Sequence, residues 1–202
     1  MQPPSHDAND ARSADDPQAG RGARPLTSSP ALAELATELL VTSAAIGELS
    51  ADEAACVVGY MGLVGYPAGA TVLREGDAGN TSYLLLILSG EVTVETADPV
   101  TATQVPISVL GPGNVIGEMG LIDGSPRSAS CIAATPLQAA GLTRKALQRL
   151  IDEQPKVAAR LMVGLCKRLA DRLRGLGEQL QIYSRLNTTL QQQLDRLAPR
   201  SR

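Results

Sequence analysis

The middle of the chain constrains the fold most, because its apolar residues come in short runs between turn-forming residues. From residue 61 to residue 143, β-branched and leucine-rich runs alternate with Gly, Asp, Asn and Pro. These runs predict strands at 61–66, 70–74, 82–88, 91–95 and 104–110, with two more short strands within 128–142. Many short strands at close spacing are typical of a β sandwich, barrel or jelly roll.

Helical patterns precede this region. Residues 1–28 are mostly Pro, Asp, Ser, Gly, Ala and Arg, and we expect them to be disordered. Apolar residues at helical spacing begin at Pro30 and continue through 31–50. Ser50 followed by Glu53 predicts a capping box at the start of a second helix.

Helical patterns also follow the strand-rich region. Thr143 is a suitable N-cap for a helix at 144–154, and Pro155 opens a long helical pattern that reaches Leu197. We therefore expect a mainly β fold with flanking α-helices. Its core is a β jelly-roll or barrel, with a short N-terminal helical bundle and a long C-terminal helix.

The composition argues against an enzyme. Aromatic residues make up 2% of the chain, with no Phe and no Trp, so stacking platforms for single-stranded nucleic acid are nearly absent. The one histidine, His6, lies in the polar N-terminal stretch, where we expect it to be solvated. Histidine-based catalysis and multi-histidine metal sites are thereby excluded, and no nucleophile–base pair or metal cluster is recognisable. We expect no catalytic residues, no metal and no cofactor.

Charge is divided unevenly along the chain. From Lys156 onward there are ten Lys or Arg and three Asp or Glu, although the whole chain has a net charge of −3. We interpret the basic region as a solvated helix face that leans toward the acidic remainder. Nucleic-acid binding by this region stays open, but no recognised motif supports it.

The three cysteines all lie in apolar runs, widely separated: Cys56, Cys131 and Cys166. We interpret them as buried, reduced thiols of a cytoplasmic protein. No apolar run reaches membrane-spanning length, and the N-terminus lacks the apolar segment of a secretion signal.

The last helical pattern contains a heptad repeat. Apolar or seam positions alternate spacings of four and three at Met162, Cys166, Leu169, Leu173, Leu176, Leu180, Tyr183, Asn187, Leu190, Leu194 and Leu197. This pattern predicts a coiled-coil homodimer, and Asn187 at an a position favours two parallel strands. A single helix packed on its own domain would explain residues 157–173 but not the rest of the seam. Gly175 and Gly177 leave open whether the helix bends or breaks there.

One short segment contains the charged residues that suggest a binding site. In "GEMGLIDGSPRSA", residues 117–129, Glu118 precedes Arg127 by nine positions. Taken alone, these two residues would most simply form a structural ion pair in a loop. Two other pieces accompany them: "REGD" at 74–77, and "LILSGEVTV" at 86–94, whose Gly90 would lie at a conformationally demanding turn.

In this order, the pieces resemble the cyclic nucleotide-binding domain family over residues 49–174. The layout is similar to the sensor half of the bacterial catabolite activator family and to the regulatory subunits of cyclic-nucleotide-dependent kinases. The phosphate-binding cassette of that family corresponds to residues 116–119 followed by 126–129. The resemblance implies a 3′,5′-cyclic purine nucleotide as ligand, with cAMP ranked first and cGMP or another cyclic nucleotide left open.

The same resemblance implies the role of each cassette residue. Arg127 would bind the phosphate through its planar fork of N–H donors. Glu118 would accept a hydrogen bond from the ribose 2′-hydroxyl, and Ser128 would reach the phosphate or the base. The other ligand-binding positions give close backbone approach or room: Gly117, Met119 and Ala129.

Two departures from the catabolite activator pattern stand out. Where polar hydroxyl residues of that family touch adenine, this chain has Arg172 and Leu173. Arg172 would stack on a purine or bond its edge, or it would be an exposed g-position charge of the coil. The residues after Arg174 follow a coil pattern with no helix-turn-helix, so we expect no DNA-binding half.

These observations predict three segments: a disordered tail at 1–28, a cyclic nucleotide-binding domain at 29–174, and a coiled-coil extension and tail at 175–202. The expected function is a stand-alone cyclic-nucleotide receptor that switches conformation on binding, forms a homodimer through the coil and signals to a downstream protein, without membrane or DNA. Two alternatives remain: a nucleotide-free structural or dimerisation module, and a truncated transcriptional regulator. The intact pair of Glu118 and Arg127 favours binding.

Overall fold

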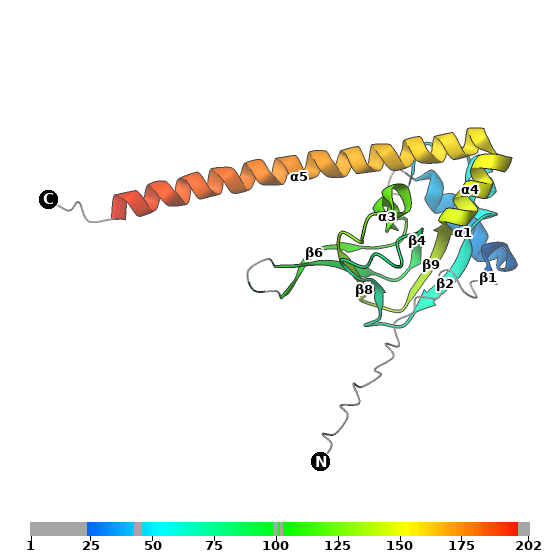
Figure 1. Cartoon of the computed structure of the whole chain (residues 1–202), viewed down its shortest axis with the longest axis horizontal. Helices are drawn as coiled ribbons and strands as arrows, with labels where there is room; N and C mark the ends of the chain where they lie inside the picture. The colour runs from blue at the N-terminus through cyan, green and yellow to red at the C-terminus, as the bar shows by residue number, and fades with distance from the viewer. Residues whose placement is uncertain (1–23, 43–45, 99–100, 102, 198–202) are drawn as a thin grey trace, which may run out of the picture.

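A β sandwich with helices at one end makes up the body of the molecule, and one long helix projects from it (Figure 1). The computed structural model describes residues 24–42, 46–98, 101 and 103–197. The predicted solvation of His6 concerns a residue outside this part of the chain.

Two antiparallel sheets form the sandwich. The first has the order β1-β2-β9-β4-β7, with β1 (Arg24–Pro25), β2 (Gly62–Tyr66), β9 (Leu137–Thr143), β4 (Tyr83–Ser89) and β7 (Val115–Ile116). The second has the order β3-β8-β5-β6, with β3 (Thr71–Leu73), β8 (Ser130–Ala133), β5 (Val92–Ala97) and β6 (Gln104–Leu110). This jelly-roll-like sandwich confirms the predicted fold class.

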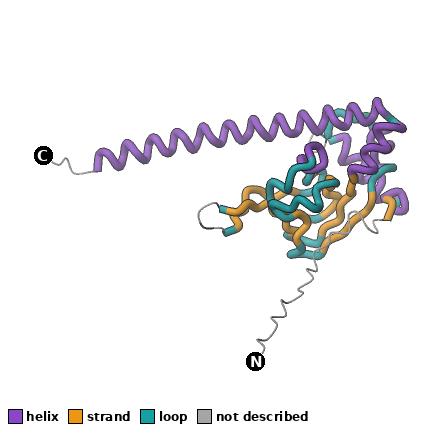
Figure 2. The backbone as a smooth tube through the Cα atoms, viewed as in Figure 1, coloured by secondary structure: helices purple, strands orange, loops and turns teal. Residues whose placement is uncertain are grey.

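The short helices gather at one end of the sandwich (Figure 2). They are the 3₁₀ helix η1 (Leu26–Ser28), α1 (Pro30–Val41), α2 (Ala51–Val58) and α4 (Arg144–Glu153), and α3 (Glu118–Asp123) lies between β7 and β8. The long helix is α5 (Pro155–Leu197). Both predicted caps are confirmed: Ser50 and Glu53 form a capping box, and the Thr143 hydroxyl accepts from the Ala146 N–H.

Strand β4 joins the two halves of the hydrophobic core. Side chains of a strand alternate between its two faces. Accordingly, Leu84, Leu86 and Leu88 pack toward the helices, whereas Tyr83, Leu85 and Ile87 pack between the sheets. An uninterrupted apolar run therefore forms one strand that is buried on both faces.

The turn between β4 and β5 depends on glycine, as predicted. Gly90 has a φ of 89°. A Cβ atom there would lie 2.3 Å from the Pro136 carbonyl oxygen. Glycine is therefore required both for its backbone conformation and for this close approach.

The predicted disordered tail was too long at its C-terminal end. Arg24 and Pro25 pair with β2, and Leu26 is fully buried in the core. This single apolar side chain anchors the segment, which composition alone could not indicate. Residues 1–23 lie outside the described residues.

The first helix was predicted to be longer than it is. Although helical spacing continues through 31–50, α1 ends at Val41 and Thr42 adopts an extended conformation. The Thr42 hydroxyl donates to the Leu39 carbonyl oxygen at 2.6 Å, which satisfies a terminal carbonyl group of the helix. Residues 43–45 lie outside the described part of the chain.

The first half of α5 is fastened to the segment around α2. Arg160 pairs with Glu53 at 2.9 Å, and Lys167 pairs with Glu48. Gly164 lies so close to the loop before α2 that a Cβ atom would lie 2.2 Å from Ile46 Cγ2 and 2.9 Å from its carbonyl oxygen. The missing side chain of Gly164 thus sets how closely α5 packs against the domain.

The second half of α5 carries exposed apolar side chains. The helix continues through Gly175 and Gly177, so these two glycines do not break it. Leu173, Leu180 and Tyr183 are 69%, 68% and 66% exposed. None of the described helices combines the length and hydrophobicity that a bilayer span requires.

Gly164→Ala should lower the free energy of unfolding by up to about 2 kcal/mol in a denaturant titration. Overpacking typically costs about 1–3 kcal/mol, against a gain of about 1 kcal/mol in helix propensity. Gly175→Ala is the matched control, because no atom lies within 4 Å of a Cβ at that position. Equal stability of the two variants would contradict the tight packing at Gly164.

Candidate functional site

The structure brings all seven predicted site residues together around one open cavity. Its wall includes Gly117, Glu118, Met119, Arg127, Ser128, Ala129 and Arg172. The first three come from the β7–α3 junction, the next three from the loop before β8, and Arg172 from α5. Apolar side chains of the sandwich complete the wall at Leu73, Val94, Ile116 and Cys131.

Gly117 shapes the junction between β7 and α3. It is the N-cap of α3 in the left-handed conformation, with φ 77°. A Cβ atom there would lie 2.7 Å from Arg127 Nη1 and 3.2 Å from the Tyr83 carbonyl oxygen. Glycine thus permits both the turn and the close approach of the arginine.

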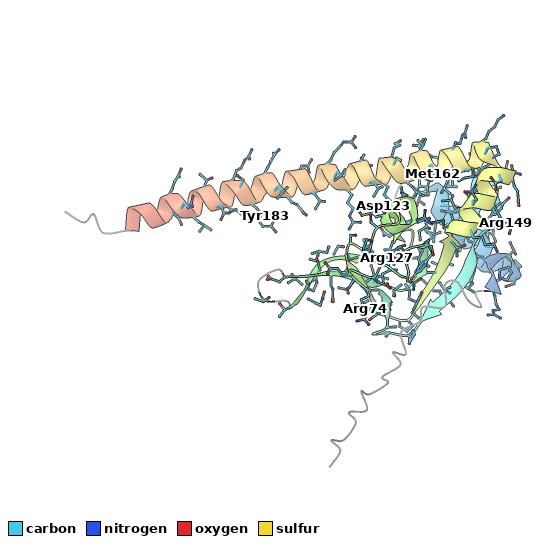
Figure 3. All side chains as sticks on the ribbon, viewed as in Figure 1. Arg74, Asp123, Arg127, Arg149, Met162 and Tyr183 are labelled. Carbon is cyan, nitrogen blue, oxygen red and sulfur yellow. The ribbon has the colours of Figure 1, made fainter. Side chains whose placement is uncertain are left out.

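Arg127 is buried, with 5% of its surface exposed, and lies inside the body of the molecule near α3 (Figure 3). Its guanidinium makes four hydrogen bonds, all to carbonyl oxygens: Nε and Nη2 donate to Asn80 at 3.0 and 2.7 Å, Nη2 to Tyr83 at 3.0 Å, and Nη1 to Gly117 at 2.7 Å. The guanidinium carbon also lies 4.6 Å from the centre of the Tyr83 ring.

These contacts orient the guanidinium, but none of the three acceptor oxygens, those of Asn80, Tyr83 and Gly117, is an anion. Burial lowers the pKa of Arg127, while the field of Tyr83 and then of Asp77 opposes that change. A buried charge is costly unless it is paired. The arrangement therefore favours the binding of an anion in the cavity, where it would compensate the charge of Arg127.

Glu118 does not pair with Arg127, so the simple ion pair considered from the sequence is not formed. Glu118 is 3% exposed, and its Oε1 lies 3.4 Å from Nη1 of Arg172. The Arg172 side chain is 48% exposed. Arg172 is therefore neither a fully solvated coil residue nor remote from the cavity, and it links α5 to α3.

Sequence reasoning missed a second arginine on α5. Arg168 precedes Arg172 by one helical turn and donates from Nη2 to Asn114 Oδ1 at 3.2 Å and to the Val115 carbonyl oxygen at 3.3 Å. Burial lowers its pKa, and the charge of Glu118 opposes this shift. The four-residue spacing of the two arginines was the available signal, since it places them on one helix face.

The cysteines differ in exposure, contrary to the expectation that all three are buried. Cys131 is buried in the cavity wall, Cys56 is half-buried, and Cys166 is exposed on α5. Burial, and secondarily the charge of Glu118, raises the pKa of Cys131 to about 12. This thiol therefore stays neutral near pH 7 and acts as an apolar part of the wall.

Two flexible side chains lie at the cavity mouth. Ser128 Oγ and Met119 Sδ are 3.6 Å apart, and both residues are exposed. The Ser128 hydroxyl is thus available at the entrance. Among the described residues, no cluster of three or more His, Cys, Asp or Glu side chains is suited to hold a metal ion.

Comparison with known proteins now identifies the family. The sequence model of the cyclic nucleotide-binding domain matches residues 63–154. A cyclic nucleotide-binding domain from Methylobacillus flagellatus has 36% sequence identity and a TM-score of 0.67, over 75% of this chain and 83% of that one. This chain belongs to the cyclic nucleotide-binding domain family. The predicted resemblance is confirmed.

Two sequence relatives of this cyclic nucleotide-binding domain are bacterial regulators. The CRP-like cAMP-activated global transcriptional regulator of Mycobacterium tuberculosis is 31% identical over 106 residues, covering 52% of this chain and 46% of that protein. The cyclic AMP receptor protein of Thermus thermophilus is 32% identical over 123 residues, covering 61% and 56%. The matched part therefore spans about half the length of these regulators.

Proposed function

We propose that the chain is a non-enzymatic receptor for a 3′,5′-cyclic purine nucleotide, with cAMP as the first candidate. The observation that carries the proposal is the buried Arg127, which lines the cavity and is bonded only to neutral oxygens. A cyclic phosphodiester is a singly charged anion that would compensate this cation. The relatives named for cAMP favour that nucleotide.

The other cavity residues suit the rest of such a ligand. Glu118 is buried in the same cavity wall as Arg127 and would accept a hydrogen bond from the ribose 2′-hydroxyl. Arg172, half exposed and bonded to Glu118, would face the base through its planar guanidinium. Ser128 at the mouth would donate to the phosphate or to the base.

The ion pair between Glu118 and Arg172 supplies a route from ligand to helix. A ribose hydroxyl that bonds to Glu118 competes with Arg172 for the same carboxylate. Because Arg172 lies on α5, this competition changes a contact that fastens the long helix. A ligand shifts a conformational equilibrium only as far as its affinities for the two states differ, and this contact would provide that difference.

We further propose a division into a nucleotide-binding part, which was predicted as 29–174 and which the pairing of Arg24 with β2 extends to residue 24, and a coiled-coil part, 175–202, through which two chains pair in parallel. The support is the row of exposed apolar seam residues: Leu173, Leu176, Leu180, Tyr183 and Leu190. Such side chains are normally covered in a coiled coil. The side chains of Leu194 and Leu197 lie outside the described ones. A downstream protein would then recognise the conformation of the paired helices.

Arg127→Ala should weaken cAMP binding at least a hundredfold in a calorimetric titration. Leaving one member of a buried charge pair without its partner costs about 3–5 kcal/mol, and here the stranded member would be the ligand phosphate. Arg127→Lys should also bind poorly, because a point charge cannot replace the planar fork.

The controls separate loss of the site from loss of the fold. Circular dichroism should show the same strand and helix content in each variant. Arg149→Ala provides a matched removal of a guanidinium on α4, which does not line this cavity, and should keep cAMP affinity. Absence of heat from cAMP, cGMP and other cyclic nucleotides with the wild-type protein would contradict the receptor proposal and favour a nucleotide-free structural module.

Leu190→Cys, in a chain with Cys56→Ser and Cys166→Ser, should form a covalent dimer under mild oxidation. A parallel, in-register pair places the two d-position residues opposite each other. Arg185→Cys in the same background is the control, because position 185 lies on the other side of the helix. Gel electrophoresis without reductant measures the cross-linking of both variants. Equal cross-linking at positions 185 and 190, or no cross-linking at position 190, would contradict the parallel coil.

A further inference from the structure

The distal part of α5 has a wider apolar face than a two-stranded coil uses. Besides the seam residues, Ile182 and Leu186 are 58% and 53% exposed. With Asn187 at an a position, Ile182 falls at c and Leu186 at g. Neither belongs to the a/d seam. In a pair of helices, Ile182 would therefore stay exposed to solvent, and Leu186 would lie at the edge of the seam and be only partly covered.

These two residues are continuous with the seam. Leu186 follows Ile182 by four positions and Tyr183 by three, and it precedes Leu190 by four. Residues at these spacings are neighbours on a helix surface. The result is a broad stripe at a, d, g and c, which is typical of helices in bundles, whereas a strict a/d stripe is typical of a coiled-coil pair.

The charge pattern changes at the same point. Between Gly175 and Gln193 the charged residues are Glu178 and Arg185, both at f positions, which border the stripe beside Ile182. The e and g positions of this stretch hold Gly, Ser, Gln and Leu instead of the charged residues that usually select a coiled-coil partner. By contrast, residues 167–174 include five charged side chains.

An uncharged flank suits further copies of the same chain. Identical helices place like charges side by side wherever their flanks are charged, and this repulsion opposes higher assembly. No charged residue occupies the e and g flanks around Leu186, and the two charged neighbours of Ile182, Glu178 and Arg185, are of opposite sign. Figure 3 shows Tyr183 on the part of α5 that projects beyond the β sandwich.

We propose that the stretch 176–190 joins two coiled-coil dimers of this chain into a four-helix bundle. Ile182 and Leu186 form the second interface. The occupant of this surface is another dimer of the same protein, so four nucleotide-binding domains would share one assembly. The inference rests on the proposed dimer, which supplies the a/d seam.

Light scattering of the full-length protein at micromolar concentration tests the bundle. The wild-type chain should have four times the chain mass. The double variant with Ile182→Gln and Leu186→Gln should have twice the chain mass, because the second interface is lost while the seam remains. The matched control, Gln181→Ala with Thr188→Ala at b positions, should keep the fourfold mass.

The outcomes distinguish this inference from the dimer proposal. A wild-type mass of two chains would overturn the bundle and leave the dimer standing, and Leu190→Cys would then still cross-link. A mass of one or three chains would overturn both. A fourfold mass that persists in the Ile182→Gln and Leu186→Gln variant would overturn the role of this surface.

Discussion

The site depends on one interaction, a buried guanidinium held by backbone carbonyl oxygens. Four hydrogen bonds fix the orientation of Arg127, and the carbonyl groups of Asn80, Tyr83 and Gly117 supply them. The left-handed Gly117 is required for this geometry, because a side chain there would collide with the guanidinium. The neighbouring Gly120 is also close-fitting, with a Cβ position 3.1 Å from Arg127 Nη1. The loop and helix are thus built around a cation whose charge remains available to a ligand.

The long helix connects this site with the rest of the molecule. Its first half is fastened to the domain by Gly164 and by two ion pairs, and Arg172 then reaches the buried Glu118. Beyond that contact, apolar side chains on the helix are exposed. The ion pair between Arg172 and Glu118 therefore lies next to the exposed apolar side chains of α5, which begin at Leu173. In the proposed dimer, this proximity would allow a ligand in the cavity to influence how the two helices pair.

Local signals in the sequence predicted the local structure well. The capping box at Ser50, the cap at Thr143 and the turn at Gly90 each depend on a few neighbouring residues, and each is confirmed. The errors arose where tertiary contacts decide. Leu26 orders a segment whose composition is that of a disordered tail, and the ion pair between Glu118 and Arg172 joins residues 54 positions apart. No spacing rule could reveal which carboxylate an arginine on α5 would meet. The cassette itself was recognisable because its Gly, Glu and Arg occur in a fixed order.

A calorimetric comparison of cAMP with adenosine tests the central claim most directly. The two ligands share the base, but adenosine lacks the anionic phosphate that is proposed to compensate Arg127. The account predicts measurable binding of cAMP and an affinity for adenosine at least about a hundredfold weaker, as expected when a buried charge loses its partner. Equal affinity for the two ligands would contradict it, since the buried guanidinium would then contribute nothing to recognition.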